Sequence, residues 1–490
     1  MKLAQPEFEC LKGAETLAVP EGYKGLYAFH KYWGKKPAEP IAYLISHLCP
    51  AGGLVIDPFL GSGVSAIEAL RLGRRVVGID LNPAAIRLTR MLVKPPSKKS
   101  VEVSVSKIKD LAKDAIGATY LTPSGAIATH YIWKGETMEQ VWRTNGTVRT
   151  RIEDVPSEHD LGMAAIFSSY QPRILRKPRF FTNSRINAKA SFELGSLFAG
   201  RALHNIELLM EAIAQLPKEF REPMLLSLTA AIGQMSSMVF AITGRGKTNG
   251  TKSEKVEVGS WVIGFWKPNV HFEVNVWNCF ERRVKKLINA LANSPALVES
   301  NLGTISEVCA GAADGALVNG NCVEELKAVP DGSADLIITD PPHSDRIPYL
   351  ELSELWNVVL DQEPVFESEI VVSNAKERGK TSKQYNESMR QFLAVAGRKL
   401  KESGHLVLFF NASTEASWEF FDVFDKTANA AGLAFKGCFP LVYSAGSVVQ
   451  DNRAGALQTD FGLVFSHSSS TNDRLLDIPN WSSTMPRPTT

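Results

Sequence analysis

The 490-residue sequence has few cysteines and no excess of charge of either sign. Lys plus Arg number 54 and Asp plus Glu 52, a formal net charge of +2, so any attraction to nucleic acid must come from local patches. The six cysteines include no Cys-x-x-Cys pair and have no histidine at metal-ligand spacing beside them. The sequence therefore predicts no metal site and reduced, mostly packed thiols at Cys10, Cys49, Cys279, Cys309, Cys322 and Cys438.

The sequence also lacks a secretory signal and a clear membrane span. The start, MKLAQPEFECLKGAE, does not have a basic region followed by an apolar one, so we expect a cytoplasmic protein with no membrane partner. The most apolar window runs from Pro223 to Thr243, but polar residues interrupt it and no aromatic belt flanks it. This window predicts a buried core helix.

Strands and helices alternate in two separate parts of the chain. From Gly53 to Pro83 the pattern is strand, Gly-rich turn, helix, strand, which is typical of a parallel βαβ unit. A second alternating region begins near Asn319: the strand ADLIITD, a helix ended by Gly404, the strand HLVLFFN and another helix. Two further strands, AFKGCFPLVYS and TDFGLVFS, suit an antiparallel pair at the sheet edge.

The alternation stops between these two parts. This middle region mixes a β-rich piece (ATHYIWKGETMEQVWRTNGTVRTRI) with long helices, as expected for an insertion into one α/β domain. A length of 490 residues fits two or three domains. We predict an N-terminal part of that domain at 1–93, an inserted recognition region at 94–302, a C-terminal part at 303–466 and a flexible tail at 467–490.

The first βαβ unit predicts a nucleoside-binding site. In DPFLGSG a strand ends at Asp57, and Gly61 and Gly63 allow a tight turn that a ligand can approach closely. Asp80 ends the next strand, about where an acidic residue meets a ribose hydroxyl in such units. The turn lacks the third glycine of the dinucleotide fingerprint, and the sequence has no Walker-type phosphate loop.

DPFLGSG resembles the S-adenosylmethionine (SAM) motif of the amino-methylating DNA methyltransferases. HKYWGKKPAEPIAYLI resembles their N-terminal SAM-binding element, in which a Lys-Pro pair precedes a helix. The resemblance implies a class I SAM-methyltransferase (Rossmann-like) α/β fold with an antiparallel edge strand, interrupted by a large mixed α+β insertion. It implies SAM as cofactor, bound by Trp33, Lys36, Pro37, Asp57, Phe59, Gly61, Gly63, Asp80, Asn82 and Asn321.

A second motif, Asp340-Pro341-Pro342-His343, directly follows the strand ADLIITD and predicts the catalytic loop. An exocyclic base amine is a poor nucleophile, so a site must orient it and accept its hydrogens. In such a loop the Asp oxygen and a proline carbonyl can accept them, while an aromatic ring stacks on the extruded base. TDPPHSDRIPYLELSELW and NRAGALQTDFGLVF resemble adenine-specific DNA methylases, with His343 where the family has Tyr and without the zinc-ribbon cysteines of many relatives.

The predicted activity is methylation of a base amine in double-stranded DNA, adenine N6 in preference to cytosine N4. Two basic stretches within the insertion are candidate DNA contacts: Arg173, Arg176, Lys177 and Arg179, and Arg245, Lys247, Lys252 and Lys255. Two alternatives remain open. One is an RNA guanine-N2 methyltransferase, which has similar motifs; the other is a catalytically impaired DNA-binding subunit that works with other subunits of a modification or defence system.

Overall fold

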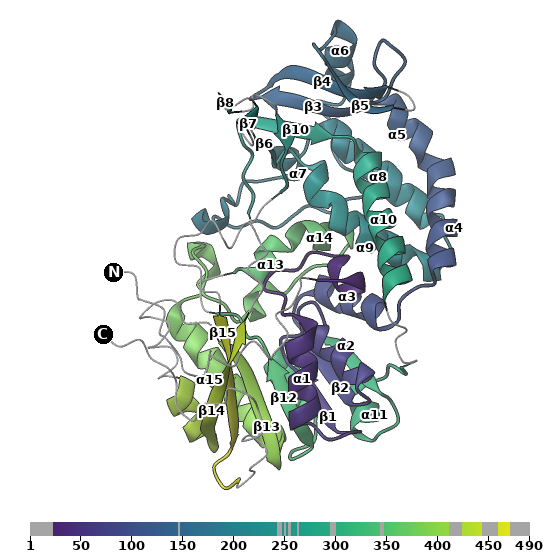
Figure 1. The fold of residues 1–490 in the computed structure, drawn as a ribbon. Coiled ribbons are helices and arrows are strands. Elements are labelled where there is room, and N and C mark those ends of the chain that lie inside the picture. Colours follow the sequence, from purple (N-terminus) through teal and green to yellow (C-terminus); the bar gives the residue numbers. More distant parts are fainter. Residues whose placement is uncertain are drawn as a thin grey trace.

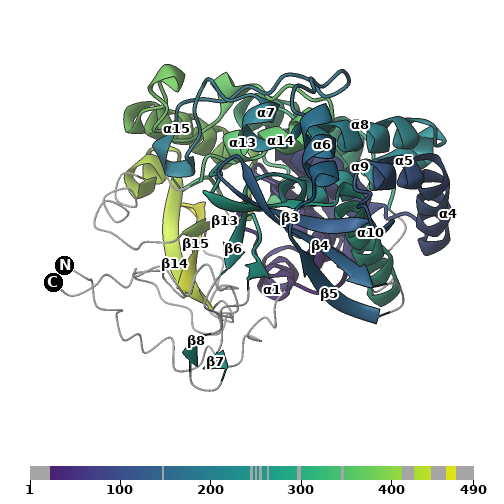
Figure 2. The same cartoon turned by 90° about the horizontal axis from the view of Figure 1, so that it is seen from above.

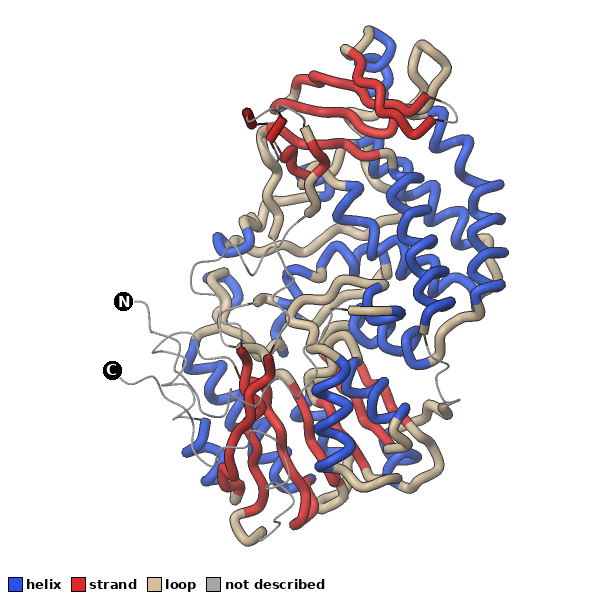
Figure 3. Tube along the Cα trace, viewed as in Figure 1, coloured by secondary structure: helices blue, strands red, loops and turns tan. Residues whose placement is uncertain are grey.

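The protein is described by a computed structural model. It describes residues 23–145, 148–242, 247–248, 251–252, 256–261, 264–294, 300–343, 347–410, 424–442 and 459–470. Two β-sheets lie at opposite ends of the molecule, with most of the long helices between them (Figure 3).

The larger sheet has seven strands, five of them parallel. Its spatial order is β11 (Gly315–Asn319), β2 (Arg75–Asp80), β1 (Leu54–Asp57), β12 (Ala334–Thr339), β13 (Leu400–Phe410), β15 (Thr459–His467) and β14 (Leu433–Val442). The first five strands pair in parallel, while β15 is antiparallel to both of its neighbours. Strands β1 and β12 are buried along their whole length, which explains their continuous apolar sequences. The predicted α/β sheet and its antiparallel edge are confirmed.

Helices cover both faces of this sheet. One face carries α1 (Ala38–Leu48), α2 (Val64–Arg71) and α3 (Pro83–Val93), whose apolar residues share a core with the insertion. The other carries α11 (Ile305–Cys309), α12 (Cys322–Glu325) and α15 (Ser382–Lys399), whose apolar residues form a second core. Helix α1 begins directly after Pro37, so the predicted helix behind the Lys-Pro pair is present. Two short helices, α13 (Tyr349–Leu352) and α14 (Glu354–Val359), follow the Asp340 loop.

The chain leaves the parallel sheet after α3 and returns to it at β11, so the sheet is assembled from both sides of a long insertion (Figure 1). The insertion contains a second, antiparallel sheet in the order β5 (Val148–Asp154), β4 (Thr137–Asn145), β3 (Ala128–Lys134), β10 (Val270–Val274), β6 (Val239–Ile242) and β9 (Glu257–Val258). Its helices are α4 (Lys98–Ile108), the π-helix η4 (Lys109–Lys113), α5 (Asp114–Ala118), α6 (Glu158–Ile166), α7 (Leu194–Leu197), α8 (Gly200–Ala214), α9 (Lys218–Ile232) and α10 (Val276–Asn293). In the view from above, α4 and α15 lie on opposite sides of the molecule (Figure 2).

One predicted helix is shorter than expected. The window Pro223–Thr243 was predicted as a single core helix, but α9 begins at Lys218 and ends at Ile232, and β6 begins at Val239. A short 3-10 helix, Gly233–Met235, follows α9, and the backbone becomes extended at Ser236. A Cβ atom at Gly233 would lie 2.3 Å from the Trp261 ring, a close approach that hydropathy cannot indicate. No described helix is both long enough and apolar enough to cross a bilayer.

A second helix boundary also differs from the prediction. Helix α15 ends at Lys399 rather than at Gly404, and strand β13 starts immediately at Leu400. Gly404 lies within that strand, where a Cβ atom would come within 2.9 Å of the Ala334 carbonyl oxygen, so this glycine permits a close approach of two strands. The next predicted helix is described only from residue 424, and residues 424–430 are helical. The five described cysteines are free thiols, and Cys10 lies outside the described residues.

Candidate active site

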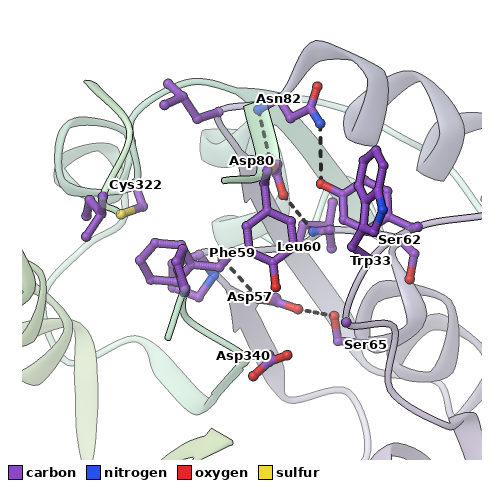
Figure 4. A pocket seen from close by; sticks show the side chains of 18 of the residues that line it. Trp33, Asp57, Phe59, Leu60, Ser62, Ser65, Asp80, Asn82, Cys322 and Asp340 are labelled. Carbon is purple, nitrogen blue, oxygen red and sulfur yellow. Dashed lines mark hydrogen bonds between the residues drawn. The ribbon is translucent and has the colours of Figure 1, made fainter. Parts of the chain in front are cut away.

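A pocket lies at the carboxyl ends of the parallel strands, where the strand order reverses. Strand β1 lies between β2, which follows it in the chain, and β12, which comes after the insertion; such a switch point opens a crevice above the sheet. The pocket encloses about 960 Å³, including the part open to solvent, which is a usual size for a small-molecule site. Asp57, Asp80 and Asp340, each at or just after a strand end, all line it (Figure 4).

The glycine turn after β1 is fixed by tight packing and by Asp57. Gly63 has φ 78°, and a Cβ atom there would lie 2.4 Å from the Thr89 side chain, so no other residue fits. The buried Asp57 carboxylate accepts hydrogen bonds from the Phe59 N–H (3.1 Å), from the Thr339 hydroxyl (2.6 Å) and from the Ser65 hydroxyl. Burial raises the pKa of Asp57 to about 6, although these hydrogen bonds lower it.

Asp80 joins the glycine turn to the start of α3. One carboxylate oxygen accepts from the Gly61 N–H (2.6 Å) and the other from the Asn82 N–H (2.8 Å). Burial raises the pKa of Asp80 to about 7, against the opposing effect of these two hydrogen bonds. Each carboxylate oxygen has two lone pairs, so Asp80 keeps acceptor capacity toward the pocket.

Three tryptophans from distant parts of the chain pack together at one wall of the pocket, and one of them, Trp33, lines it. Trp33 lines the pocket and stacks on Trp356, with ring centroids 4.4 Å apart and planes 19° apart. Trp261, from the insertion, meets the edge of Trp33 at 6.1 Å. The Trp33 indole N–H is buried and has no hydrogen-bond partner among the described residues. The N-terminal element, the insertion and the segment after Asp340 therefore meet at this wall.

The Asp340 carboxylate is held by two cationic or hydrogen-bonding side chains. Lys36 Nζ lies 2.9 Å from one oxygen, and His343 Nε2 lies 2.9 Å from the other. The three side chains are only 12%, 16% and 17% exposed for Lys36, Asp340 and His343. The Tyr385 hydroxyl donates to the Pro342 carbonyl at 2.5 Å, which fixes the loop from α15. The Lys-Pro element and the catalytic-loop motif, about 300 positions apart, are thus in direct contact.

Most of the predicted site residues gather at this pocket. The pocket lining includes Trp33, Lys36, Asp57, Phe59, Gly61, Asp80, Asn82, Asn321, Asp340 and Pro342. Four others lie beside the lining rather than in it: Pro37, Gly63, Pro341 and His343. The Asn82 and Asn321 side chains cap the starts of α3 and α12, so both also have a structural role.

Sequence reasoning missed several pocket residues. They are Tyr32, Lys35, Ser65, Cys322, Tyr349, Glu369 and Phe409. Tyr32 and Tyr349 stack with ring centroids 6.3 Å apart, and Tyr349 follows the Asp340 motif closely in the sequence, so an aromatic residue there was the available signal. Glu369 lies in irregular chain with no motif around it.

The first basic stretch mainly connects the insertion to the segment after Asp340. Arg176 makes a two-pronged contact with the fully buried Glu354 carboxylate at 2.8 and 3.2 Å, and Arg179 contacts Glu367 at 2.8 Å. Arg173 and Lys177 are largely exposed and have only long contacts, of 3.7 and 3.5 Å, with carboxylates. Arg176 is therefore committed to an internal ion pair.

The second basic stretch is only partly described. Lys247 and Lys252 are backbone pairing partners in a two-stranded antiparallel sheet, formed by β7 (Lys247–Thr248) and β8 (Thr251–Lys252). Arg245 and Lys255 lie outside the described residues.

The N-terminal part of the chain matches a known family. The model for N6/N4 DNA methylases matches residues 14–91, which include α1, the glycine turn and Asp80. This segment is thus similar to the N6/N4 DNA methylases. The resemblance read from the sequence motifs is confirmed at the level of the family.

The curated proteins that this chain resembles include type II methyltransferases. It is 25% identical over 105 residues to M.MjaII of Methanocaldococcus jannaschii, a match that covers 21% of this chain and 18% of the relative. It is 38% identical over 64 residues to M2.DpnII of Streptococcus pneumoniae and 31% identical over 64 residues to M2.LlaDCHI of Lactococcus lactis subsp. cremoris, each covering 12% of this chain and 24% of the relative. The matches thus span less than a quarter of each relative's length.

Proposed function

We propose that this protein transfers a methyl group from SAM to an exocyclic amine of a flipped base in double-stranded DNA. The proposed target is adenine N6 in preference to cytosine N4, and the proposed location is the cytoplasm. The observation that carries the proposal is that the Asp340 carboxylate and the Asp57–Asp80 unit line one pocket. The class I SAM-methyltransferase fold is part of the proposal. It is supported by the parallel strands around a switch point and by the antiparallel strand β15 inserted beside the sheet edge.

The pocket fits a SAM molecule in chemistry and size. Remaining lone pairs of Asp80 suit ribose hydroxyls, the apolar Phe59 and Leu60 suit an adenine ring, and the open glycine turn admits close approach. The unpaired Trp33 indole N–H is a buried donor beside the same space. When bound, SAM supplies an electrophilic methyl group on a sulfonium. The residues that would hold it are Trp33, Lys36, Pro37, Asp57, Phe59, Gly61, Gly63, Asp80, Asn82 and Asn321.

Asp340 would orient the base amine for in-line attack. A carboxylate oxygen and the Pro341 carbonyl would accept the two amine hydrogens and so favour the tetrahedral nitrogen of the transition state. The Pro342 carbonyl already accepts from Tyr385, which stiffens the loop. Lys36 would fix the orientation of Asp340, because its ammonium lies 2.9 Å from one carboxylate oxygen.

His343 would contribute a stacking face. Its hydrogen bond to Asp340 lies in the plane of the ring and therefore does not use the faces on which a base stacks. A ring tied to Asp340 in this way would also align the base with the carboxylate that binds its amine.

Exposed cations of the insertion would contact the DNA backbone. Of the predicted contacts, Arg173 and Lys177 are exposed and only loosely paired, and Lys247 and Lys252 belong to the short β7–β8 pair. The DNA contacts of Arg245 and Lys255 stay predictions. Those of Arg176 and Arg179 also stay predictions, because the ion pairs of these two residues would have to break before they could bind DNA.

Single-turnover reactions with labelled SAM test the proposal. Duplex DNA and RNA of matched length would be offered in parallel, and the modified base identified by nucleoside analysis. N6-methyladenine in DNA is the expected product. N4-methylcytosine would change the target base, labelled RNA alone would favour the guanine-N2 alternative, and DNA binding without transfer would favour the impaired subunit.

A further inference from the structure

A cluster of cations without carboxylate partners lies between helix α10 and the N-terminal loop that lines the pocket. It consists of Lys31, Arg283 and Lys286, and we call it the α10 seam. Lys31 and Lys286 are exposed and Arg283 is half-buried. No ion pair to any of the three is present within the described part of the chain, whereas the neighbouring Lys285 pairs with Glu281 at 2.6 Å. The chain's net charge is only +2, so this local excess is distinctive.

Contacts at both ends of α10 place the seam against the loop. Ser294, just after the end of the helix, accepts from the Leu26 N–H at 2.9 Å. At the other end, Cys279 Sγ donates to the Gln234 carbonyl at 3.5 Å, and the Gln234 side chain accepts from the Trp261 N–H at 3.1 Å. Cys279, Arg283 and Lys286 are spaced by four and three positions, so they lie on one face of the helix. Helix α10 thus packs against the 3-10 helix Gly25–Ala28 of the N-terminal loop at its C-terminal end and against the segment that holds Trp261 at its N-terminal end.

The seam continues to the wall of the pocket. Lys31 Nζ lies 5.4 Å from the centre of the Trp261 ring, and Trp261 contacts the pocket residue Trp33. Lys35, which also lines the pocket, is held in place by donating to the Tyr27 and His30 carbonyls at 2.7 and 3.1 Å. The seam is thus linked to the pocket residue Trp33 through Lys31 and Trp261.

The cations repel one another. Two effects lower the pKa of both Lys31 and Lys286. Partial burial of the side chain is the larger, and the nearby Arg283 guanidinium is the smaller. Burial, and then Lys286, lower the pKa of Lys35 to about 7. Like charges at short range are unfavourable without an anion between them, so a bound polyanion would relieve the repulsion.

We propose that the α10 seam binds the phosphodiester backbone of the DNA strand next to the flipped base. The inference rests on the proposed function, because the pocket that the seam borders is the one assigned to SAM and the base. Lysine and arginine contacts to phosphates position a duplex without reading its sequence. The seam would therefore fix the distance between the backbone and Asp340, whatever sequence the insertion reads.

The test measures duplex DNA binding by fluorescence anisotropy at several salt concentrations. Lys31→Ala, Lys286→Ala and Arg283→Gln would each be compared with the wild type, and then combined. Each lost phosphate contact should reduce the slope of log affinity against log salt by about 0.9, so the triple variant should lose roughly 2–3 units. Lys285→Ala is the matched control on the same helix, and its slope should be unchanged.

SAM affinity and thermal unfolding verify that each variant is folded; if Arg283→Gln unfolds, the two exposed lysines still test the seam. If the wild type methylates DNA and the folded triple variant keeps the wild-type slope, the proposed role of the seam is overturned but the proposed function is not. A wild type that neither binds nor methylates duplex DNA would overturn both. A loss seen with duplex RNA and not with DNA would assign the seam to RNA instead.

Discussion

Replacing Asp80 by Ala tests the cofactor site most directly, because this carboxylate connects three parts of it. The change removes the acceptor of the Gly61 and Asn82 N–H groups and the proposed partner of the ribose. A hydrogen bond to a charged group contributes about 1.5–3 kcal/mol, and water entering the pocket would replace part of the loss. We expect SAM affinity to fall by about 1–3 kcal/mol, or roughly 5- to 150-fold.

The stability of the ligand-free protein should change much less. Because the folded-state pKa of Asp80 is raised to about 7, its ionised form is disfavoured by folding; stability from this group is full below the unfolded pKa and is lost as the pH rises through 7. At pH 8 the variant therefore loses two hydrogen bonds but also loses a buried charge. Thermal unfolding at that pH measures the balance.

The pH dependence of SAM binding isolates Asp80 from other groups. If the ligand requires the ionised carboxylate, a pKa of about 7 predicts that affinity falls about tenfold from pH 8 to pH 6. Asp57 and Glu369, near the pocket, also have raised pKa values, and the ligand has titrating groups of its own. These groups are the same in measurements on the wild type and on Asp80→Ala, so they do not account for a difference between the two. Calorimetry should show a weaker pH dependence for Asp80→Ala. Equal pH dependence, or unchanged affinity in the folded variant, would refute the assignment.

Three further outcomes are expected. Asp340→Ala should lose methyl transfer in single-turnover assays and keep SAM binding, since Asp340 acts on the amine; an active variant would contradict the mechanism. His343→Ala should be impaired while His343→Phe retains activity, because stacking is worth about 1–3 kcal/mol per base; equal activity of the two variants would exclude stacking. Arg176→Ala should destabilise the fold by about 3–5 kcal/mol in denaturant titrations, because it leaves the buried Glu354 without its partner, and an unchanged midpoint would contradict this.

Local sequence patterns predicted the parts of the fold that short segments determine. The strand–turn–helix around Gly61 and the antiparallel strand pair β14–β15 follow from hydrophobic period and turn residues, whereas the helix after Pro37 was implied by the family resemblance. Because parallel strands end at one edge, the motifs at Asp57 and Asp340 could be expected to meet, and both line the pocket.

Features made by long-range contacts could not be predicted in this way. Arg176 looked like a surface cation, but its partner Glu354 lies 178 positions away in a helix that gives no signal for it. The α10 seam was not predicted because Lys31 lies about 250 positions from Arg283 and Lys286, and the basic run RRVKK alone does not reveal that contact. The ends of α9 and α15 were misplaced because the glycines Gly233 and Gly404 lie at close approaches to Trp261 and Ala334, which local sequence does not reveal.

The tryptophan wall has a thermodynamic consequence for the whole molecule. Trp33 belongs to the N-terminal element, Trp356 to the segment after Asp340 and Trp261 to the insertion, so the pocket residue Trp33 packs against both of the other segments. If the proposed binding of a duplex shifts Trp261 and thereby changes the free energy of binding the proposed cofactor, the cofactor must by reciprocity change the affinity for the duplex by the same factor. Cooperativity between the two ligands is therefore expected from the packing of a single indole pair.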